Sequence, residues 1–233
     1  MIRLNVVVEG DTEEIFVNEI LAPALGERMV FATAHRITTK RNNQKTWRGG
    51  LLKWDHLARD IRLWMKQDTG PDARFTTMID YYALPHDFPG YTDLPTGDSV
   101  TRIAMLERAM MTDLANRLPE LRVADRFIPY IQRHEFEALL FSAPLEFEAA
   151  FPGDRSGIAA ITNIRKVFSN PEDIDDGQAT APSKRILKIW PDYDKPVSPM
   201  LIAQHIGLPA MRRECPAFDR WVARLEALGT PAH

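Results

Sequence analysis

The chain has very little cysteine and no long apolar run. The lone Cys215 excludes an intramolecular disulfide and a zinc site built from cysteines, and it fits a reducing compartment. No stretch of about 18 apolar residues is free of charge, so no membrane span is encoded. The apolar run at the N-terminus is too short for a signal peptide. We therefore expect a cytoplasmic protein with no membrane partner.

Neither sign of charge dominates the composition. The 233 residues include 29 Lys and Arg against 32 Asp and Glu, a formal net charge of −3. Hydrophobic residues make up 45% and charged residues 26%, which excludes a wholly disordered chain, a collagen and a coiled coil. The Gly-Lys-Ser/Thr signature of a phosphate-binding loop is also missing. We therefore expect that this chain does not itself hydrolyse ATP.

One segment carries an excess of positive charge. Residues 36–62 hold eight Lys or Arg and two Asp, a net charge of +6, whereas the rest of the chain sums to −9. Such a local excess predicts an anion-binding surface, with a solvated loop and helix face as the alternative. For a nucleic-acid partner, the predicted phosphate contacts are Arg36, Lys40, Arg41, Lys45, Arg48 and Lys53.

Strand and helix patterns alternate along the first 150 residues. Apolar runs ending in Gly or Asp predict buried strands, and apolar residues at helical spacing predict helices between them. The predicted strands cover residues 4–8, 30–38, 75–80 and 126–132. Ser99 is the predicted cap of the helix that follows the Pro- and Gly-rich loop 84–98. This alternation predicts an α/β fold: a parallel sheet of about four strands flanked by helices.

Beyond residue 150 the pattern changes to helices only. Candidate helices are separated by Pro, Gly and Asp, and no strand is convincing. They cover residues 157–168, 182–190, 198–206 and 217–228. We expect an α/β domain over residues 1–150 and a helical C-terminal extension, residues 151–233, packed on it.

Carboxylates follow three of the predicted strands. Glu9 follows the first strand, Asp80 ends the third, and Glu135 and Glu137 come soon after the fourth. Ligands of open parallel sheets bind beyond the carboxyl ends of the strands. Oxygen ligands gathered there suit Mg²⁺ or Mn²⁺, which polarises a phosphoryl oxygen and lowers the pKa of bound water. The alternative is that each acid caps the next helix.

Residues 7–13, Val-Val-Glu-Gly-Asp-Thr-Glu, resemble the opening motif of the Toprim domain. This domain occurs in topoisomerases, bacterial primases, recombination-mediator proteins and overcoming-lysogenization-defect nucleases. The resemblance implies that Glu9 is a metal ligand or general acid/base, with Glu13 as the second Glu of the nuclease branch. A later Toprim strand ends in Asp-x-Asp, whereas Asp80 is followed here by Tyr81 and Tyr82. The oxygen missing at Tyr82 would then come from Glu135, Glu137 or Asp87.

Three longer strings narrow the resemblance. They are Thr-Met-Ile-Asp-Tyr-Tyr-Ala-Leu-Pro at 77–85, Asp-Phe-Pro-Gly at 87–90 and His-Glu-Phe-Glu-Ala-Leu-Leu-Phe-Ser at 134–142. With the N-terminal motif they are similar to domain-of-unknown-function family 4276, a Toprim-related family often encoded beside an ABC/SMC-like ATPase in bacterial defence loci. The resemblance implies a Toprim-like, Rossmannoid sheet and such an ATPase as partner.

Two functions follow from these observations. The first is a Mg²⁺- or Mn²⁺-dependent nuclease of Toprim type, in phage defence or DNA repair. Glu9 and Asp80 would be catalytic, and Glu9, Glu13, Asp80, Glu135 and Glu137 would hold the metal. The second is a non-catalytic regulatory or docking subunit of an ATPase, which Tyr82 in place of the second Asp favours. DNA or RNA as substrate, and the oligomeric state, stay open.

Overall fold

The computed structural model describes residues 1–37, 53–174 and 180–229. Its centre is a five-stranded parallel sheet in the order β2-β1-β3-β4, with β5 also paired to β3. The strands are β1 (Ile2–Val8), β2 (Val30–Arg36), β3 (Ala73–Asp80), β4 (Phe127–Ile128) and β5 (Ile131–Gln132). The parallel α/β sheet predicted from the alternating pattern is confirmed, with β1 and β3 as neighbours at its centre.

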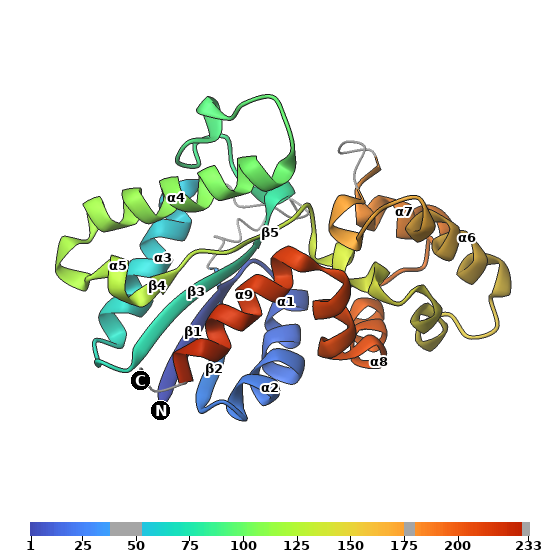
Figure 1. Ribbon diagram of the computed structural model, residues 1–233, viewed down its shortest axis with the longest axis horizontal. Helices are drawn as coiled ribbons and strands as arrows, with labels where there is room; N and C mark the ends of the chain where they lie inside the picture. The colour runs from blue at the N-terminus through green and yellow to red at the C-terminus, as the bar shows by residue number, and fades with distance from the viewer. Residues whose placement is uncertain (38–52, 175–179, 230–233) are drawn as a thin grey trace, which may run out of the picture.

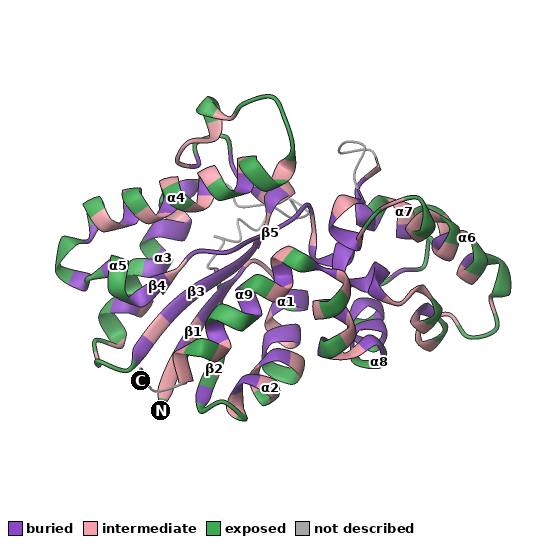
Figure 2. Ribbon diagram, in the orientation of Figure 1, coloured by how far each residue is buried: buried purple, intermediate pink, exposed green. Residues whose placement is uncertain are grey.

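Helices cover both faces of this sheet (Figure 1). One face packs against α3 (Trp54–Gln67), α4 (Ser99–Arg117) and α5 (Val123–Arg126). The other packs against α1 (Asp11–Phe16), η1 (Val17–Leu21), α2 (Ala22–Gly26) and α9 (Pro216–Glu226). Between these layers β1 and β3 are mostly buried, whereas the edge strand β2 and the outer helix faces are largely exposed or half-buried (Figure 2).

The remaining helices gather beyond the carboxyl ends of the strands (Figure 1). They are α6 (Arg155–Lys166), α7 (Pro182–Ile189) and α8 (Val197–Glu214). Short turns connect the elements: η2 (Tyr81–Ala83), η3 (Tyr91–Asp93), η4 (Pro119–Leu121), η5 (Phe136–Ser142), η6 (Pro144–Ala149), η7 (Pro171–Asp173) and η9 (Ala227–Gly229). Among the described residues, no helix is long and apolar enough to cross a membrane.

Two local predictions need correction. The cap of α4 is Asp98, whose Oδ1 accepts a hydrogen bond of 2.8 Å from the N–H of Thr101, and not Ser99. The strand predicted over 126–132 is interrupted between β4 and β5. Pro129 lies in the gap and has no N–H to donate to a ladder.

The hydroxyl of Thr77 takes over hydrogen bonds at this interruption. Thr77 Oγ1 donates to the carbonyl of Tyr130 at 2.8 Å and accepts from the N–H of Tyr130 at 3.0 Å. Both residues are buried, where an unpaired backbone group is costly. The Thr77 side chain therefore replaces the hydrogen bonds between strands that are missing at Tyr130.

Thr77→Val is expected to lower the free energy of unfolding by about 1–3 kcal/mol, because it leaves both backbone groups of Tyr130 unpaired. Urea unfolding measures the change. Thr112→Val is the matched control on the exposed side of α4, and we expect a change within about 0.5 kcal/mol. Equal effects of the two variants would contradict this account of the interruption.

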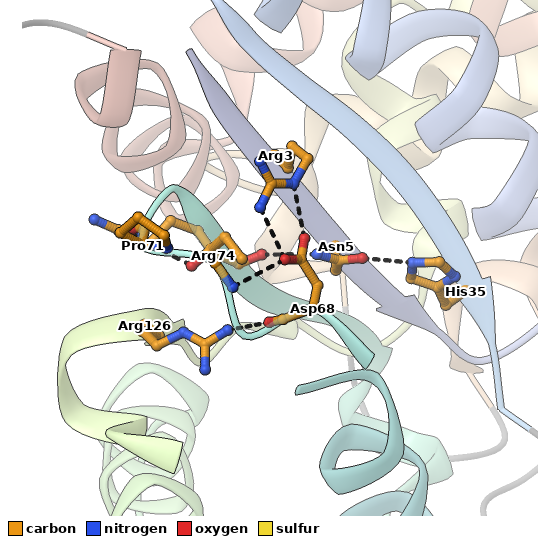
Figure 3. Close-up of polar contacts among 9 residues, drawn as sticks. Arg3, Asn5, His35, Asp68, Pro71, Arg74 and Arg126 are labelled. Atoms are coloured by element: carbon orange, nitrogen blue, oxygen red, sulfur yellow. Dashed lines mark hydrogen bonds and ion pairs between the residues drawn. The ribbon is translucent and has the colours of Figure 1, made fainter. Parts of the chain in front are cut away.

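A second polar network closes the opposite end of the sheet (Figure 3). The guanidinium of Arg3 donates to both oxygens of Asp68, at 2.8 and 2.9 Å, and Arg126 donates to the Asp68 carbonyl. These bonds fix the connection between α3 and β3, and the Arg3 guanidinium holds the pKa of the Asp68 carboxyl below its usual range. The charged residues at this end of the sheet therefore stabilise the fold.

Glu107 on α4 gives the fold a pH-dependent contribution. Its Oε1 accepts the N–H of Ile131 at 3.0 Å. Burial raises the pKa of Glu107 to about 7, although that bond and the charges of Arg224 and Arg220 oppose the rise. The folded state thus keeps the proton up to about pH 7, whereas the unfolded chain releases it near pH 4.5. Stability is lost between these two values as the pH rises.

Glu107→Gln is expected to raise the free energy of unfolding by about 1–3 kcal/mol at pH 8 and to leave it unchanged below pH 4.5, since glutamine imitates the protonated acid. Unfolding curves at several pH values test this. Glu120→Gln, an exposed change, should show no such pH dependence. A stabilisation that is the same at all pH values would exclude the protonation of Glu107 as its cause.

Candidate functional site

Two of the predicted acids lie side by side because their strands are neighbours. Val8 pairs with Met78 in the parallel ladder of β1 and β3. Glu9, directly after β1, and Asp80, at the end of β3, therefore reach the same edge of the sheet. The backbone N–H of Asp80 forms a hydrogen bond to the Glu9 carboxylate. This is the convergence that the sequence predicted for the carboxyl ends of parallel strands.

Glu13 belongs to the same region and also has a structural task. It lies in the first turn of α1 and is buried. Its Oε2 accepts the N–H of Gly10 at 3.0 Å, as the acid of a capping box does. Both interpretations of Glu13, helix cap and acid of a site, are therefore compatible with its position.

The two acids after β5 are held by residues far away in the sequence. Glu135 Oε2 accepts the N–H of Ser183 at 2.8 Å. Glu137 is only 1% exposed, and its Oε1 accepts the hydroxyl of Tyr193 at 3.3 Å and forms an ion pair with Lys195. The last third of the chain thus supplies partners to the predicted acids.

The charges of these acids act on one another. Burial is the main cause that raises the pKa of Asp80 well above its usual range, followed by the negative charges of Glu13 and Glu9. Burial and then the charge of Glu13 raise the pKa of Glu9 to about 7. The pKa values of Glu13 and Glu135 are raised as well, again mainly by burial and then by Glu137 for Glu135. Together these residues form one carboxylate cluster: Glu9, Glu13, Asp80, Glu135 and Glu137.

Three oxygens of the carboxylate cluster are buried without a hydrogen-bond donor. They are Oε2 of Glu9, Oδ1 of Asp80 and Oε2 of Glu137, each without a partner within the described part of the chain. A buried anionic oxygen without a donor is costly unless a cation satisfies it. An all-oxygen donor set suits a hard divalent cation such as Mg²⁺ or Mn²⁺.

The cluster is not arranged as a finished metal site. Over residues 1–37, 53–174 and 180–229, no three Asp, Glu, His or Cys side chains already form a group able to hold a metal ion. The carboxylates would have to rotate to share one ion. The donor chemistry therefore fits a divalent cation, while the present side-chain positions do not preform its coordination.

Tyr82 lies two residues after Asp80, where the Toprim resemblance predicts a second acid. Its N–H donates to the carbonyl of His134 at 3.1 Å, and the two rings lie 5.2 Å apart. His134 has a positive φ of 61°, which is rare for a residue with a side chain, and it directly precedes Glu135. Asp87, named as a source of the missing oxygen, instead accepts the N–H of Trp54 at the start of α3.

Of the six residues predicted to contact nucleic acid, the structure describes Arg36 and Lys53. Arg36 forms ion pairs with Asp11 and with Glu14, at 3.7 Å to the latter. Lys53 is exposed just before α3. The other four predicted contacts lie outside the described residues: Lys40, Arg41, Lys45 and Arg48.

A pocket of about 370 Å³ lies away from these acids. Leu145 and Glu148 of η6 and several residues of α6, from Arg155 to Lys166, form its walls. None of the predicted site residues lines this pocket.

Comparison with protein families gives a match that covers most of the chain. The family described as a domain of unknown function (DUF4276) matches residues 8–226. The chain belongs to this family. The DUF4276 match includes the carboxylate cluster together with the distant residues Ser183, Tyr193 and Lys195. Searches of curated proteins and of solved structures found no match.

Sequence reasoning missed Lys195 and Tyr193. Both lie in the short connection between α7 and α8, where a Lys next to a Pro is an ordinary loop signal. No local pattern links them to an acid almost 60 positions earlier. The DUF4276 match, which extends to residue 226, includes both residues.

Proposed function

We propose that this DUF4276 protein is a Mg²⁺- or Mn²⁺-dependent phosphodiesterase that acts on nucleic acid. One observation carries the proposal: three buried carboxylate oxygens, on Glu9, Asp80 and Glu137, have no donor within the described residues and lie at the carboxyl edge of a parallel sheet. This is the edge where ligands of such sheets bind. The Toprim-like motif of residues 7–13 supports the same chemistry, and we propose a distant relationship to Toprim nucleases.

Cation binding and acid/base catalysis would fall to the acids of the carboxylate cluster. Glu9, Asp80 and Glu137 would hold the cation, with Glu13 and Glu135 at its periphery. When bound, the cation polarises a phosphoryl oxygen and lowers the pKa of a bound water. The pKa of Glu9, raised to about 7 in the metal-free protein, lets its carboxylate take up or release a proton near neutral pH. Glu9 therefore suits general acid/base catalysis better than a fully ionised surface acid would.

A cleavage assay tests this function directly. The purified protein is incubated with labelled single-stranded DNA, double-stranded DNA and RNA, with Mg²⁺, Mn²⁺ or a chelator, and with or without the ABC/SMC-like ATPase proposed as its cytoplasmic partner. We expect cleavage of at least one substrate with a divalent cation and none with the chelator. Absence of cleavage under every condition, together with no binding of Mn²⁺, would overturn the proposal.

A second candidate is a non-catalytic docking subunit of the same ATPase. Tyr82 at the place of the second acid favours it, as does the ion pair that Lys195 already makes with Glu137. For this candidate the protein would bind the ATPase without cleaving nucleic acid. The assay above separates the two when ATP hydrolysis by the partner is measured alongside cleavage, since a docking subunit changes that hydrolysis and leaves every nucleic acid intact.

Charge reversal of Lys40, Arg41 and Lys45 is expected to weaken nucleic-acid binding and to flatten its salt dependence by about one unit of slope per lost phosphate contact. Fluorescence anisotropy at several salt concentrations measures both. Reversal of Lys166, Lys184 and Lys188 on α6 and α7 is the control with the same change of charge. Equal losses in both triple variants would show that net charge alone, and not the segment, governs binding.

A further inference from the structure

The connection between α7 and α8 places a cation against the carboxylate cluster. Lys195 Nζ forms an ion pair with Glu137 Oε1, and Tyr193 donates its hydroxyl to the same oxygen. The two partners of the ion pair differ sharply in exposure: the side chain of Lys195 is 49% exposed and that of Glu137 is 1% exposed. The ammonium therefore reaches in from solvent to a buried acid.

The charge of Lys195 acts on the whole carboxylate cluster. It opposes the burial that raises the pKa values of Glu9, Glu13 and Glu135. Burial opposes the charge of Lys195 itself, but Glu137, Asp80 and Glu135 raise its pKa above the ordinary value. One positive charge faces five acids, so it offsets their mutual repulsion only in part.

We propose that Lys195 is a tethered counter-cation that occupies the carboxylate cluster in the metal-free protein and competes with a divalent cation for Glu137. This inference rests on the proposed function, because it concerns the same site. Glu137 has one oxygen engaged by Lys195 and one without a donor. A divalent ion that shares this carboxylate is repelled by the ammonium and must displace it or tolerate it.

The tether makes such an exchange possible without unfolding. Half of the Lys195 side chain is already in contact with water, so the ammonium can swing outward and stay solvated while its stem stays in place. Loss of the ammonium should therefore strengthen cation binding, whereas loss of a true ligand should weaken it. This opposite sign distinguishes a competitor from a ligand.

Mn²⁺ binding, measured by titration calorimetry and by the loss of the free-ion paramagnetic resonance signal, tests the proposal without any activity assay. We expect Lys195→Met and Lys195→Gln to bind Mn²⁺ about 10-fold more tightly than the wild type, in line with removal of one like charge. Lys195→Arg keeps the charge and should stay within about 3-fold of the wild type. Lys188→Met removes a charge from the exposed side of α7 and should change nothing.

A second measurement tests whether Lys195 stabilises the metal-free protein. Lys195→Met should lower the melting temperature in the presence of a chelator, and saturating Mn²⁺ should remove the difference from the wild type. Lys195→Gln, which keeps a donor for Glu137, serves if the methionine variant does not fold. Tyr193→Phe removes a neutral donor from the same oxygen and should alter Mn²⁺ affinity by less than about 3-fold, which separates charge from packing.

The outcomes distinguish this inference from the function it rests on. Wild-type Mn²⁺ binding with equal or weaker binding by both neutral variants overturns the role of Lys195 and leaves the metal site standing. Detectable binding only in the neutral variants supports the competition. No Mn²⁺ binding by any variant overturns both the competition and the metal-dependent function.

Discussion

Mn²⁺-dependent cleavage is expected to fall below detection in Glu9→Gln and in Asp80→Asn, while both variants unfold at or above the melting temperature of the wild type in the absence of metal. Each amide keeps the size of the side chain and removes the charge that a cation needs. The charge is also what burial disfavours: the pKa values of both carboxyls are raised, first by burial and then by neighbouring acids. Neutral side chains therefore suit the metal-free fold.

Two exposed acids provide the control for this pair. Glu27→Gln and Asp72→Asn make the same chemical changes at exposed positions, and they should retain full cleavage. Cleavage is measured with a labelled substrate, and unfolding by circular dichroism with a chelator present. Retained activity in Glu9→Gln would remove that residue from the mechanism. Loss of activity together with a lower melting temperature would assign the acid to the fold instead.

Phe16→Ala is expected to lower the free energy of unfolding by about 3–5 kcal/mol, the usual cost of emptying a fully buried aromatic position. The ring of Phe16 is completely buried and contacts Phe136 of η5 and Phe218 of α9, with centroids 5.2 and 6.0 Å away. It joins three segments that lie far apart in the sequence. A cavity there cannot close by movement of one helix alone.

Urea unfolding, followed with two spectroscopic probes, checks this prediction. Phe31→Ala is the matched control, because Phe31 on β2 is 47% exposed and its loss should change stability by about 0.5 kcal/mol or less. Phe16→Leu should recover much of the stability, since leucine refills most of the space. A change below 1 kcal/mol in Phe16→Ala would show that this part of the core repacks freely.

The strand ends were predictable because they depend on local patterns. A run of β-branched residues followed by Glu9 and Gly10, and another ending in Asp80, indicate where buried strands stop. Parallel pairing then requires the two acids to share an edge. The sequence could also indicate most helices, since their apolar spacing is regular, and most of their bounds shift by only a few residues in the structure. The exception is the helix predicted over 198–206, because α8 continues past a non-helical Gly207 to Glu214.

What was missed depends on contacts between distant segments. The ion pair of Lys195 with Glu137 and the bond from Ser183 to Glu135 have no local signature. The same applies to Asp87, an acid in a loop whose true partner is the start of α3. The break between β4 and β5 had a local cue in Pro129, but its repair by Thr77 did not. Charge pattern alone likewise gave no sign that Arg36 pairs with acids of α1.

The position of α9 has a consequence for the order in which the chain folds during its synthesis. Trp221 of α9 donates to Thr76 on β3 at 2.9 Å and stacks on Tyr130, so part of one face of the sheet is covered by residues translated after all five strands. During synthesis the part of that face around Thr76 and Tyr130 lacks this cover until α9 leaves the ribosome. Lys195 likewise emerges long after Glu9 and Asp80. A nascent chain therefore carries its carboxylates before their counter-charge, and we expect it to need chaperone protection or rapid completion at this stage.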